Sequence, residues 1–201
     1  MTAPRGWMKR TFGTTTATHD LPSAPPPGPG APSEVPVRRS EYMDQDAELV
    51  RFTLDGDGLP TGFLASRRGR LVILADGSPE EMVNPASRRL PTLGLYAFRV
   101  RGVSYHADQV RAGNFKPGTR VLLVREPNNE HDPNAVAVRS VRGGHLAGYV
   151  NQQNAARIAK RLDAGEELEA VTLRGGGVGN EETPWVLVAT PAVMAHLHRM
   201  L

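Results

Sequence analysis

The apolar segments of this chain are short, and turn-forming residues separate them. One of the longest, residues 71–75, is followed at once by Asp76 and Gly77. A membrane-spanning helix needs about 20 consecutive apolar residues, so the sequence excludes a transmembrane protein. Short apolar runs divided by glycine, proline and asparagine are typical of β-rich folds. We therefore expect a mainly β (α+β) protein.

The strand signals are strongest in the second half of the chain, over residues 93–201. A helix is expected to follow Asn151, because apolar residues recur at helical spacing as far as Leu162. A short helix at 107–112 and a last helix after Thr190 are also expected. Strands are predicted at residues 95–103, 119–125, 135–139, 146–150, 168–173 and 185–189. Together these elements predict a domain built as a small antiparallel β-barrel with one or two helices.

The preceding segment, residues 41–92, is predicted to be a small β-meander. Apolar residues alternate over 47–54, and further strands are predicted at 62–66 and 71–74. A helix is predicted from Ser78, because Ser-Pro-Glu-Glu resembles a capping box with proline in the first turn. So few residues make only a thin core by themselves. We therefore expect the meander to cover one face of a neighbouring sheet.

Residues 1–40 form a proline-rich tail that we predict to be disordered. They contain eight of the 17 prolines, and residues 21–36 offer few side chains that pack. Five basic and two acidic residues in this segment account for the whole formal net charge of +3. Such a tail attracts polyanions weakly. A solubilising linker without a partner is the alternative interpretation.

Composition and motifs exclude several classes of enzyme. The 201-residue chain has no cysteine, which removes disulfides, thiolate nucleophiles and cysteine-ligated zinc. It also has no Gly-Lys-Ser/Thr, Gly-x-Ser-x-Gly or His-Glu-x-x-His sequence. We therefore expect no catalytic residue, no cofactor and no metal. Because the first residues lack the apolar segment of a secretory signal, we expect a cytoplasmic protein.

One polar cluster, Glu130-His131-Asp132, permits two interpretations. A metal-ligand triplet is one of them, and a tight polar turn next to Pro133 is the other. The turn is favoured, because aspartate and asparagine side chains bond to their own backbone in such places. A metal-dependent nuclease would need Glu126, His131 and Asp132 to converge on one ion.

The same region carries the most specific motif of the chain. Residues 125–136 are Arg-Glu-Pro-Asn-Asn-Glu-His-Asp-Pro-Asn-Ala-Val. Gly102 and Tyr105 precede them, and Leu-Ala-Gly-Tyr-Val at 146–150 and an alanine-rich helix follow. In this order the features resemble the HIRAN domain family, over residues 95–189. The resemblance implies an OB-like β-barrel that grips the 3′ end of single-stranded DNA.

The resemblance also assigns the candidate binding residues. It implies aromatic rings that stack on the terminal bases and polar groups that bond to the 3′-hydroxyl and phosphate. Tyr105 is expected to stack, while Asn128, Asn129 and Asp132 supply donors and acceptors from one rigid turn. In the alternative interpretation, Tyr105 and Tyr149 only plug the ends of the barrel. The candidate nucleic-acid-binding residues are Tyr105, His106, Asn128, Asn129, His131, Asp132, Tyr149 and Gln152.

This chain departs from the family pattern at four positions of that site. Ser104 stands where arginine is usual, and Gln152 stands where the family has a phosphate-contacting lysine. His106 and His131 stand where aromatic residues, the second a tyrosine, are usual. Fewer cations reduce the attraction for phosphate. Because an unperturbed imidazole titrates at about pH 6.5, we expect tighter binding near about pH 6 than about pH 8.

We interpret the chain as a non-enzymatic module that recognises single-stranded DNA through its 3′-hydroxyl end. It would serve DNA repair, replication or restriction. Its expected partners are that DNA end and a separately encoded DNA-processing enzyme, and we expect no membrane partner. A protein–protein interaction adaptor without nucleic-acid activity is the first alternative. The metal-dependent nuclease is the second.

Overall fold

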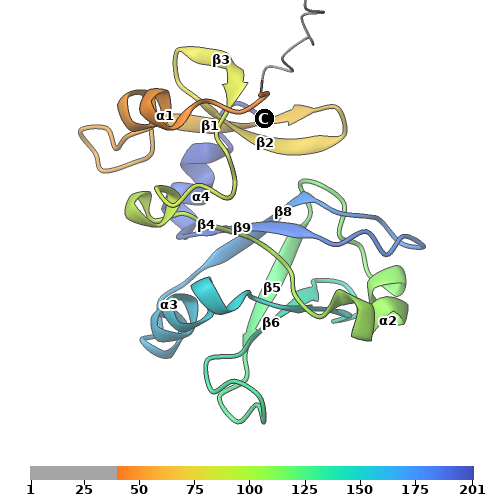
Figure 1. Ribbon diagram of the computed structural model, residues 1–201. Coiled ribbons are helices and arrows are strands. Elements are labelled where there is room, and N and C mark those ends of the chain that lie inside the picture. Colours follow the sequence, from red (N-terminus) through yellow and green to blue (C-terminus); the bar gives the residue numbers. More distant parts are fainter. Residues whose placement is uncertain (1–39) are drawn as a thin grey trace, which may run out of the picture. The chain divides into compact units, whose positions relative to one another are not determined.

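The computed structural model describes residues 40–201, which form two antiparallel β-sheets and a few short helices (Figure 1). The mainly β architecture predicted from the sequence is confirmed. The proline-rich tail for which we predicted disorder lies outside the described residues, apart from Ser40. No helix among residues 40–201 combines the length and the apolar character that crossing a membrane requires.

The larger sheet has six strands, and every neighbouring pair is antiparallel. The strands are β4 (Tyr96–Arg99), β5 (Arg120–Arg125), β6 (Val136–Ser140), β7 (Leu146–Tyr149), β8 (Glu169–Arg174) and β9 (Trp185–Ala189). Their order in space is β4-β9-β8-β5-β6-β7. The sheet curls, so that Arg101, just beyond β4, pairs with Tyr149 through two backbone hydrogen bonds of 2.9 Å. The two edges therefore meet at one point, in the manner of a small barrel.

We call this pairing of Arg101 with Tyr149 the seam, and Gly148 makes it possible. The φ angle of Gly148 is 138°, a value that residues with a side chain rarely adopt. A Cβ atom at this position would also overlap the carbonyl oxygen of Arg101. The two backbones approach so closely that only glycine fits between them.

The inner face of the curled sheet holds the first hydrophobic core. Val138 of β6 lies in it, fully buried among residues from the other strands. Two helices close over this face, α2 (Ala107–Ala112) and α3 (Gln152–Asp163). They contribute Val110 and Ile158 to the core. Both helices lie where the sequence predicted them.

The smaller sheet consists of β1 (Gly62–Arg67), β2 (Arg70–Ala75) and β3 (Ser78–Met82), in that order. Arg68 and Gly69 both have positive φ and form the tight turn between β1 and β2. The apolar face of this sheet packs on the outer face of β8 and β9 in a second core. The prediction that this segment covers a neighbouring sheet is therefore confirmed.

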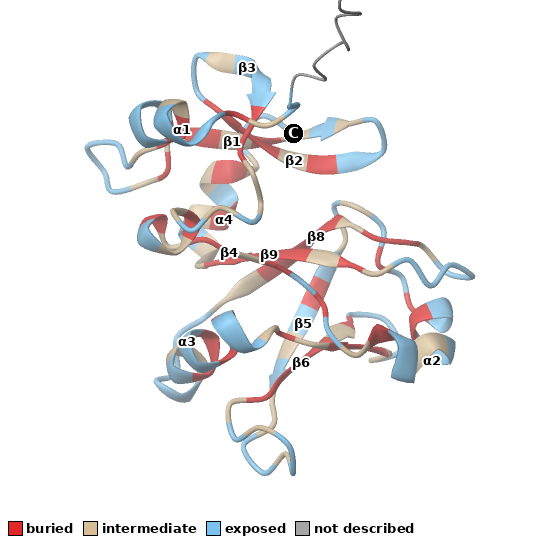
Figure 2. Cartoon of the chain, in the orientation of Figure 1, coloured by how far each residue is buried: buried red, intermediate tan, exposed pale blue. Residues whose placement is uncertain are grey.

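Strands β8 and β9 are consequently buried on both faces (Figure 2). Along β9, Val186 and Val188 belong to the inner core, whereas Leu187 and Ala189 belong to the outer core. The C-terminal helix α4 (Pro191–Leu197) packs into the outer core as well. A strand covered on both sides has no polar face, which explains the unbroken apolar run in β9.

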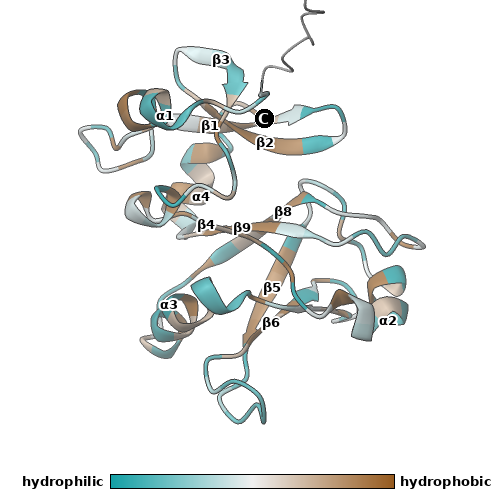
Figure 3. Ribbon diagram, viewed as in Figure 1, coloured by the Kyte–Doolittle hydropathy of each residue, from teal (hydrophilic) through white to brown (hydrophobic). Residues whose placement is uncertain are grey.

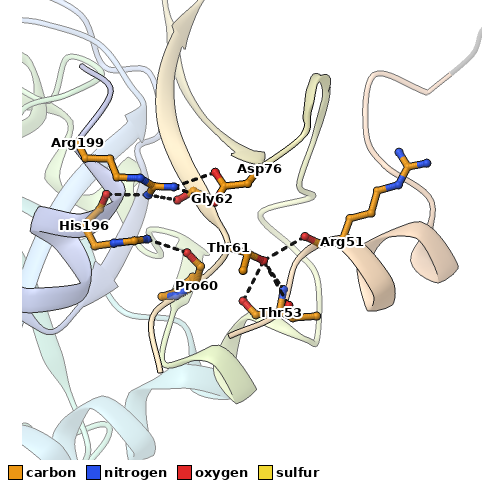
Figure 4. Close-up of polar contacts among 8 residues, drawn as sticks. All are labelled: Arg51, Thr53, Pro60, Thr61, Gly62, Asp76, His196 and Arg199. Atoms are coloured by element: carbon orange, nitrogen blue, oxygen red, sulfur yellow. Dashed lines mark hydrogen bonds and ion pairs between the residues drawn. The ribbon is translucent and has the colours of Figure 1, made fainter. Parts of the chain in front are cut away.

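Polar contacts tie the end of the chain to the smaller sheet (Figure 4). Arg199 donates from Nη1 to the carbonyl oxygen of Gly62 at 2.6 Å, and its Nη2 lies 2.8 Å from Oδ1 of Asp76. The Nε2 atom of His196 lies 3.0 Å from the carbonyl oxygen of Pro60. These contacts supplement the outer core in holding the smaller sheet in place.

Two predictions for the first half of the chain are wrong. Residues 47–54 are not a strand, because most of them belong to the helix α1 (Gln45–Arg51). Asp44 caps this helix by accepting a hydrogen bond from the N–H of Ala47 at 2.7 Å. Ser78 begins strand β3 instead of a helix, because pairing with β2 outweighs the local capping signal. Proline is tolerated in β3 because the strand lies at the edge of its sheet.

The remaining elements are two single turns of 3₁₀ helix, η1 (Leu90–Leu93) and η2 (Val103–His106). Asn151 precedes α3 with extended backbone, as expected of a capping residue. Its side chain does not cap the helix, however, because its Oδ1 accepts a hydrogen bond from Nδ2 of Asn154 at 2.9 Å.

Candidate functional site

Tyr105 stands on the turn η2, directly after the seam. Gly102 precedes the turn with a φ of 77°, and its carbonyl oxygen accepts a hydrogen bond from the N–H of Tyr105 at 3.0 Å. The backbone of Tyr105 is thus fixed, while 88% of the residue is exposed. The alternative in which Tyr105 plugs the barrel does not agree with this exposure.

His106 and Tyr149 bring the turn into contact with β7. Their ring centroids lie 6.1 Å apart, and the planes are inclined by 58°. Tilted aromatic pairs at this separation attract each other. Both side chains are half-buried, so they hold η2 against the seam and leave Tyr105 as the exposed ring.

The loop between β5 and β6, drawn in mostly hydrophilic colours in Figure 3, is ordered by its own side chains. Oδ1 of Asn129 accepts hydrogen bonds from the N–H groups of His131 at 3.0 Å and Asp132 at 3.4 Å. Oδ1 of Asp132 in turn accepts from the N–H of Asn134 at 2.7 Å. This is the tight polar turn favoured by the sequence.

Glu126 joins this loop to Tyr149. Its Oε2 accepts a hydrogen bond from Nδ2 of Asn129 at 3.1 Å, and its Oε1 lies 3.5 Å from Nη2 of Arg139. Burial raises the pKa of the Tyr149 phenol, and the negative charge of Glu126 raises that pKa further. The phenol therefore stays protonated at neutral pH.

The polar groups that the protein does not use define what the site can bind. Both ends of the Asn129 amide are bonded within the loop, so Asn129 positions the turn. Asn128 is exposed, and its side chain forms no hydrogen bond within residues 40–201, so it offers a donor and an acceptor. Asp132 retains the Oδ2 atom as an acceptor. The exposed ring of Tyr105 on η2 adds a flat apolar surface.

Two predicted residues stand apart from this network. Gln152 is exposed at the first position of α3, and His131 is exposed in the loop. Neither side chain forms a hydrogen bond in the part of the chain that the structure describes. Glu126 and Arg139, by contrast, belong to the network, although sequence reasoning did not assign them to the binding site. No spacing along the sequence marks their link to Tyr149, because Tyr149 comes from a different strand.

The carboxylates of the loop do not converge on a metal site. Within residues 40–201, no three His, Asp or Glu side chains are arranged to hold a metal ion. Glu126 bonds to Asn129, and Oδ1 of Asp132 faces its own backbone. The ligand set that the nuclease alternative requires is therefore not formed by Glu126, His131 and Asp132.

Comparison with known proteins gives one family match, in which residues 93–174 match the model of the HIRAN domain. The crystal structure of the HIRAN domain of human HLTF is 24% identical, and the match covers 52% of this chain and 83% of that chain with a TM-score of 0.39. The HLTF HIRAN domain in its DNA-bound conformation is also 24% identical, with coverages of 52% and 82% and a TM-score of 0.36. A protein from Lactobacillus plantarum is 24% identical, with coverages of 48% and 99% and a TM-score of 0.35. Among curated proteins, none matches the chain.

Proposed function

The chain carries a HIRAN domain at residues 93–174, and from this premise we propose that it binds single-stranded DNA and recognises the free 3′-hydroxyl end. The binding surface consists of η2, the loop between β5 and β6, and the end of β7. Gln152 lies at its margin. The chain itself has no catalytic role in this proposal, and a separately encoded DNA-processing enzyme in the cytoplasm acts on the DNA end that it holds.

The exposure of Tyr105 carries the proposal. An aromatic ring that is 88% exposed on a hydrogen-bonded turn offers a flat apolar surface on a backbone that is already ordered. Stacking of one nucleic-acid base on such a ring contributes about 1–3 kcal/mol, as measured by alanine substitution. This gain does not depend on base identity, so we expect little sequence preference.

Asp132 supports selection of the hydroxyl end. Its free Oδ2 accepts a hydrogen bond from a 3′-hydroxyl group, and Asn128 in the same loop supplies a further donor and acceptor. A phosphate at the same place would bring a second negative charge against the Asp132 carboxylate. The site therefore favours a free hydroxyl end over a phosphorylated end or a continuing strand.

The test is fluorescence anisotropy with a short single-stranded oligonucleotide that ends in a 3′-hydroxyl or a 3′-phosphate. We expect the wild type to bind the hydroxyl end more tightly. Tyr105→Ala should lose about five- to hundredfold in affinity, equivalent to about 1–3 kcal/mol. Tyr105→Phe keeps the ring and should bind almost as the wild type does.

A second variant separates end recognition from stacking. Asp132→Asn retains the acceptor that bonds to the N–H of Asn134 but removes the negative charge. We expect it to bind the two ends with similar affinity. If the wild type binds neither oligonucleotide, or if Tyr105→Ala binds as the wild type does, the proposal is wrong and the adaptor alternative is favoured.

A further inference from the structure

A groove lined by four arginines lies next to the proposed site for the DNA end. Four parts of the chain form it: residues between 86 and 91, strand β4 with the residues just beyond it, the first turns of α3, and Trp185 of β9. Its volume is about 570 Å³, and no aspartate or glutamate lines it. The four residues are Arg88, Arg99, Arg101 and Arg157, and we call this hollow the arginine groove.

These four arginines have no acidic partner. Within residues 40–201 none of them forms an ion pair, whereas eight other arginines do. Arg99 alone of the four has a side-chain hydrogen bond in this part of the chain, at 3.4 Å to Oγ1 of Thr183. Like charges gathered in one hollow repel each other and create a positive potential. An anion bound there would relieve this repulsion.

The arginine groove leads to the turn that carries Tyr105. Arg99 and Arg101 also line a second hollow, together with Ser104, the neighbour of Tyr105. The backbone of Arg101 forms one side of the seam with Tyr149. The groove therefore shares two of its arginines with a hollow at the turn that carries Tyr105. Glu181 also lines that hollow and pairs with Arg111.

Trp185 adds an aromatic side chain to the groove. It pairs directly with Arg99 between β9 and β4, so the two side chains lie on the same face of the sheet. The side chain is half-buried, so part of it is accessible. Cations that follow a phosphate backbone and an aromatic ring that meets a base are the combination used by single-strand binding grooves.

We propose that the arginine groove binds the phosphate backbone of the nucleotides that precede the 3′ end. This inference rests on the proposed function and extends it from the terminal nucleotide to a longer single strand. Ser104 and Gln152 carry no charge, so the groove supplies the cations that the end site lacks. Arg88 precedes the matched residues 93–174, so the segment outside the HIRAN match contributes to binding.

The test compares two double variants with the same change in charge. Arg88→Gln with Arg157→Gln removes two cations of the groove, and both residues are exposed. Arg70→Gln with Arg142→Gln removes two exposed arginines that line neither the groove nor the end site. Neither member of the control pair forms an ion pair within residues 40–201. The two double variants are therefore expected to fold alike.

Affinity is measured by anisotropy for oligonucleotides of about three and about twelve nucleotides with a free 3′-hydroxyl. The wild type should bind the longer one about tenfold more tightly or better, because more phosphates are contacted. The groove variant should lose about tenfold for the longer oligonucleotide and less than about twofold for the shorter one. Its slope of log affinity against log salt should fall by about 1.4, the value for two phosphates of a single strand.

The contributions of the two sites can be distinguished. If the groove variant binds the longer oligonucleotide as the wild type does, or if the control variant loses as much, the groove inference is overturned. If a 3′-phosphate and Tyr105→Ala have no effect while the groove variant still loses affinity, end recognition fails and the groove stands. Absence of wild-type binding to both oligonucleotides overturns both proposals.

Tryptophan fluorescence provides an independent readout. The chain has two tryptophans, Trp7 and Trp185, so a Trp7→Phe variant reports on the groove alone. We expect the longer oligonucleotide to quench this fluorescence and the shorter one to leave it unchanged. Equal quenching by both would place the terminal nucleotide in the groove and contradict the arrangement proposed.

Discussion

The strands of the six-stranded sheet are not all covered on both faces. Strands β8 and β9 lie between two hydrophobic cores, whereas β5 is covered on one face only. Leu187 of β9 is fully buried, while Leu122 of β5 is 44% exposed. We call β8 and β9 the closed half, and β5 with the turns that adjoin it and the seam the open half. Strands β6 and β7 are themselves almost fully buried. The candidate site lies on the turns of the open half and at the end of β7. The closed half provides a rigid foundation, and the open half leaves side chains free to bind.

The arrangement shows what the first half of the chain contributes to the fold. The smaller sheet covers β8 and β9 and leaves the outer face of β5 in water. Removing residues 1–92 would therefore expose Val171, Leu187 and their neighbours in the outer core. Point substitutions, and not deletion of this region, are the suitable way to compare the two halves.

Gly148→Ala should have the largest effect on stability, because Gly148 lies at the seam that joins the two edges of the sheet. The new methyl group would overlap the carbonyl oxygen of Arg101, and the positive φ adds strain. We expect a loss of about 4 kcal/mol in the free energy of unfolding, measured by chemical denaturation. Gly144→Ala is the control, because its φ is also positive but a Cβ atom there meets nothing within 4 Å. Equal losses in the two variants would show that the seam needs no close approach.

Leu187→Ala tests the closed half directly. It leaves a cavity between two covered layers, so we expect a loss of about 3 kcal/mol in the free energy of unfolding. Leu122→Ala removes the same atoms from the exposed face of β5 and should cost less than about 1 kcal/mol. If the two variants lose the same free energy of unfolding, burial of β9 on both faces does not stabilise the protein more than burial of β5 on one face.

Glu126→Gln tests how the loop is linked to Tyr149. Loss of the negative charge should lower the pKa of the Tyr149 phenol, because Glu126 holds that pKa above its ordinary value. The glutamine can still accept a hydrogen bond from Asn129, so we expect a stability loss of only about 1 kcal/mol. Titration of the tyrosine ring signals by NMR measures the pKa. Glu130→Gln, an exposed neighbour, is the control and should leave the Tyr149 pKa unchanged.

Thr172→Val should have the smallest effect, and it should be favourable. Among residues 40–201, Oγ1 of Thr172 is the one buried side-chain polar atom without a hydrogen-bond partner. Removing it should stabilise the closed half by up to about 1 kcal/mol, measured by thermal unfolding. Thr61→Val is the matched comparison and should destabilise, because its hydroxyl group donates to the carbonyl oxygens of Arg51 and Thr53 (Figure 4). A destabilised Thr172→Val variant would contradict this prediction.

The sequence predicted the elements of residues 93–201 better than the segment that covers β8 and β9. The predicted strand at 185–189 and helix at 107–112 have the observed bounds, because an apolar run and flanking turn residues agree there. The helix α1 was missed because seven residues are too few to show helical periodicity, and Asp44 was its one signal. Strand β3 was missed because its hairpin pairing with β2 across Asp76 and Gly77, and not the capping pattern at Ser78, decides its conformation.

For the candidate site, too, the sequence predicted local contacts but not contacts between distant segments. The polar turn was predicted correctly, since it is made by side chains bonding to nearby backbone. The link through Glu126 to Tyr149 and the arginine groove join segments that are far apart in the chain. Such groups come together only when the sheet curls, and no spacing along the sequence reports that.

The pairing of β4 with β9 also governs the order of events during synthesis. β4 is the first strand of the larger sheet to leave the ribosome, and its one partner within the sheet order, β9, is the last. Until β9 emerges, Tyr96 and Phe98 have no neighbouring strand, and the seam has no support on that side. The sheet therefore folds late and slowly for its size. In the interval its apolar strands stay exposed to other chains, so aggregation competes with folding.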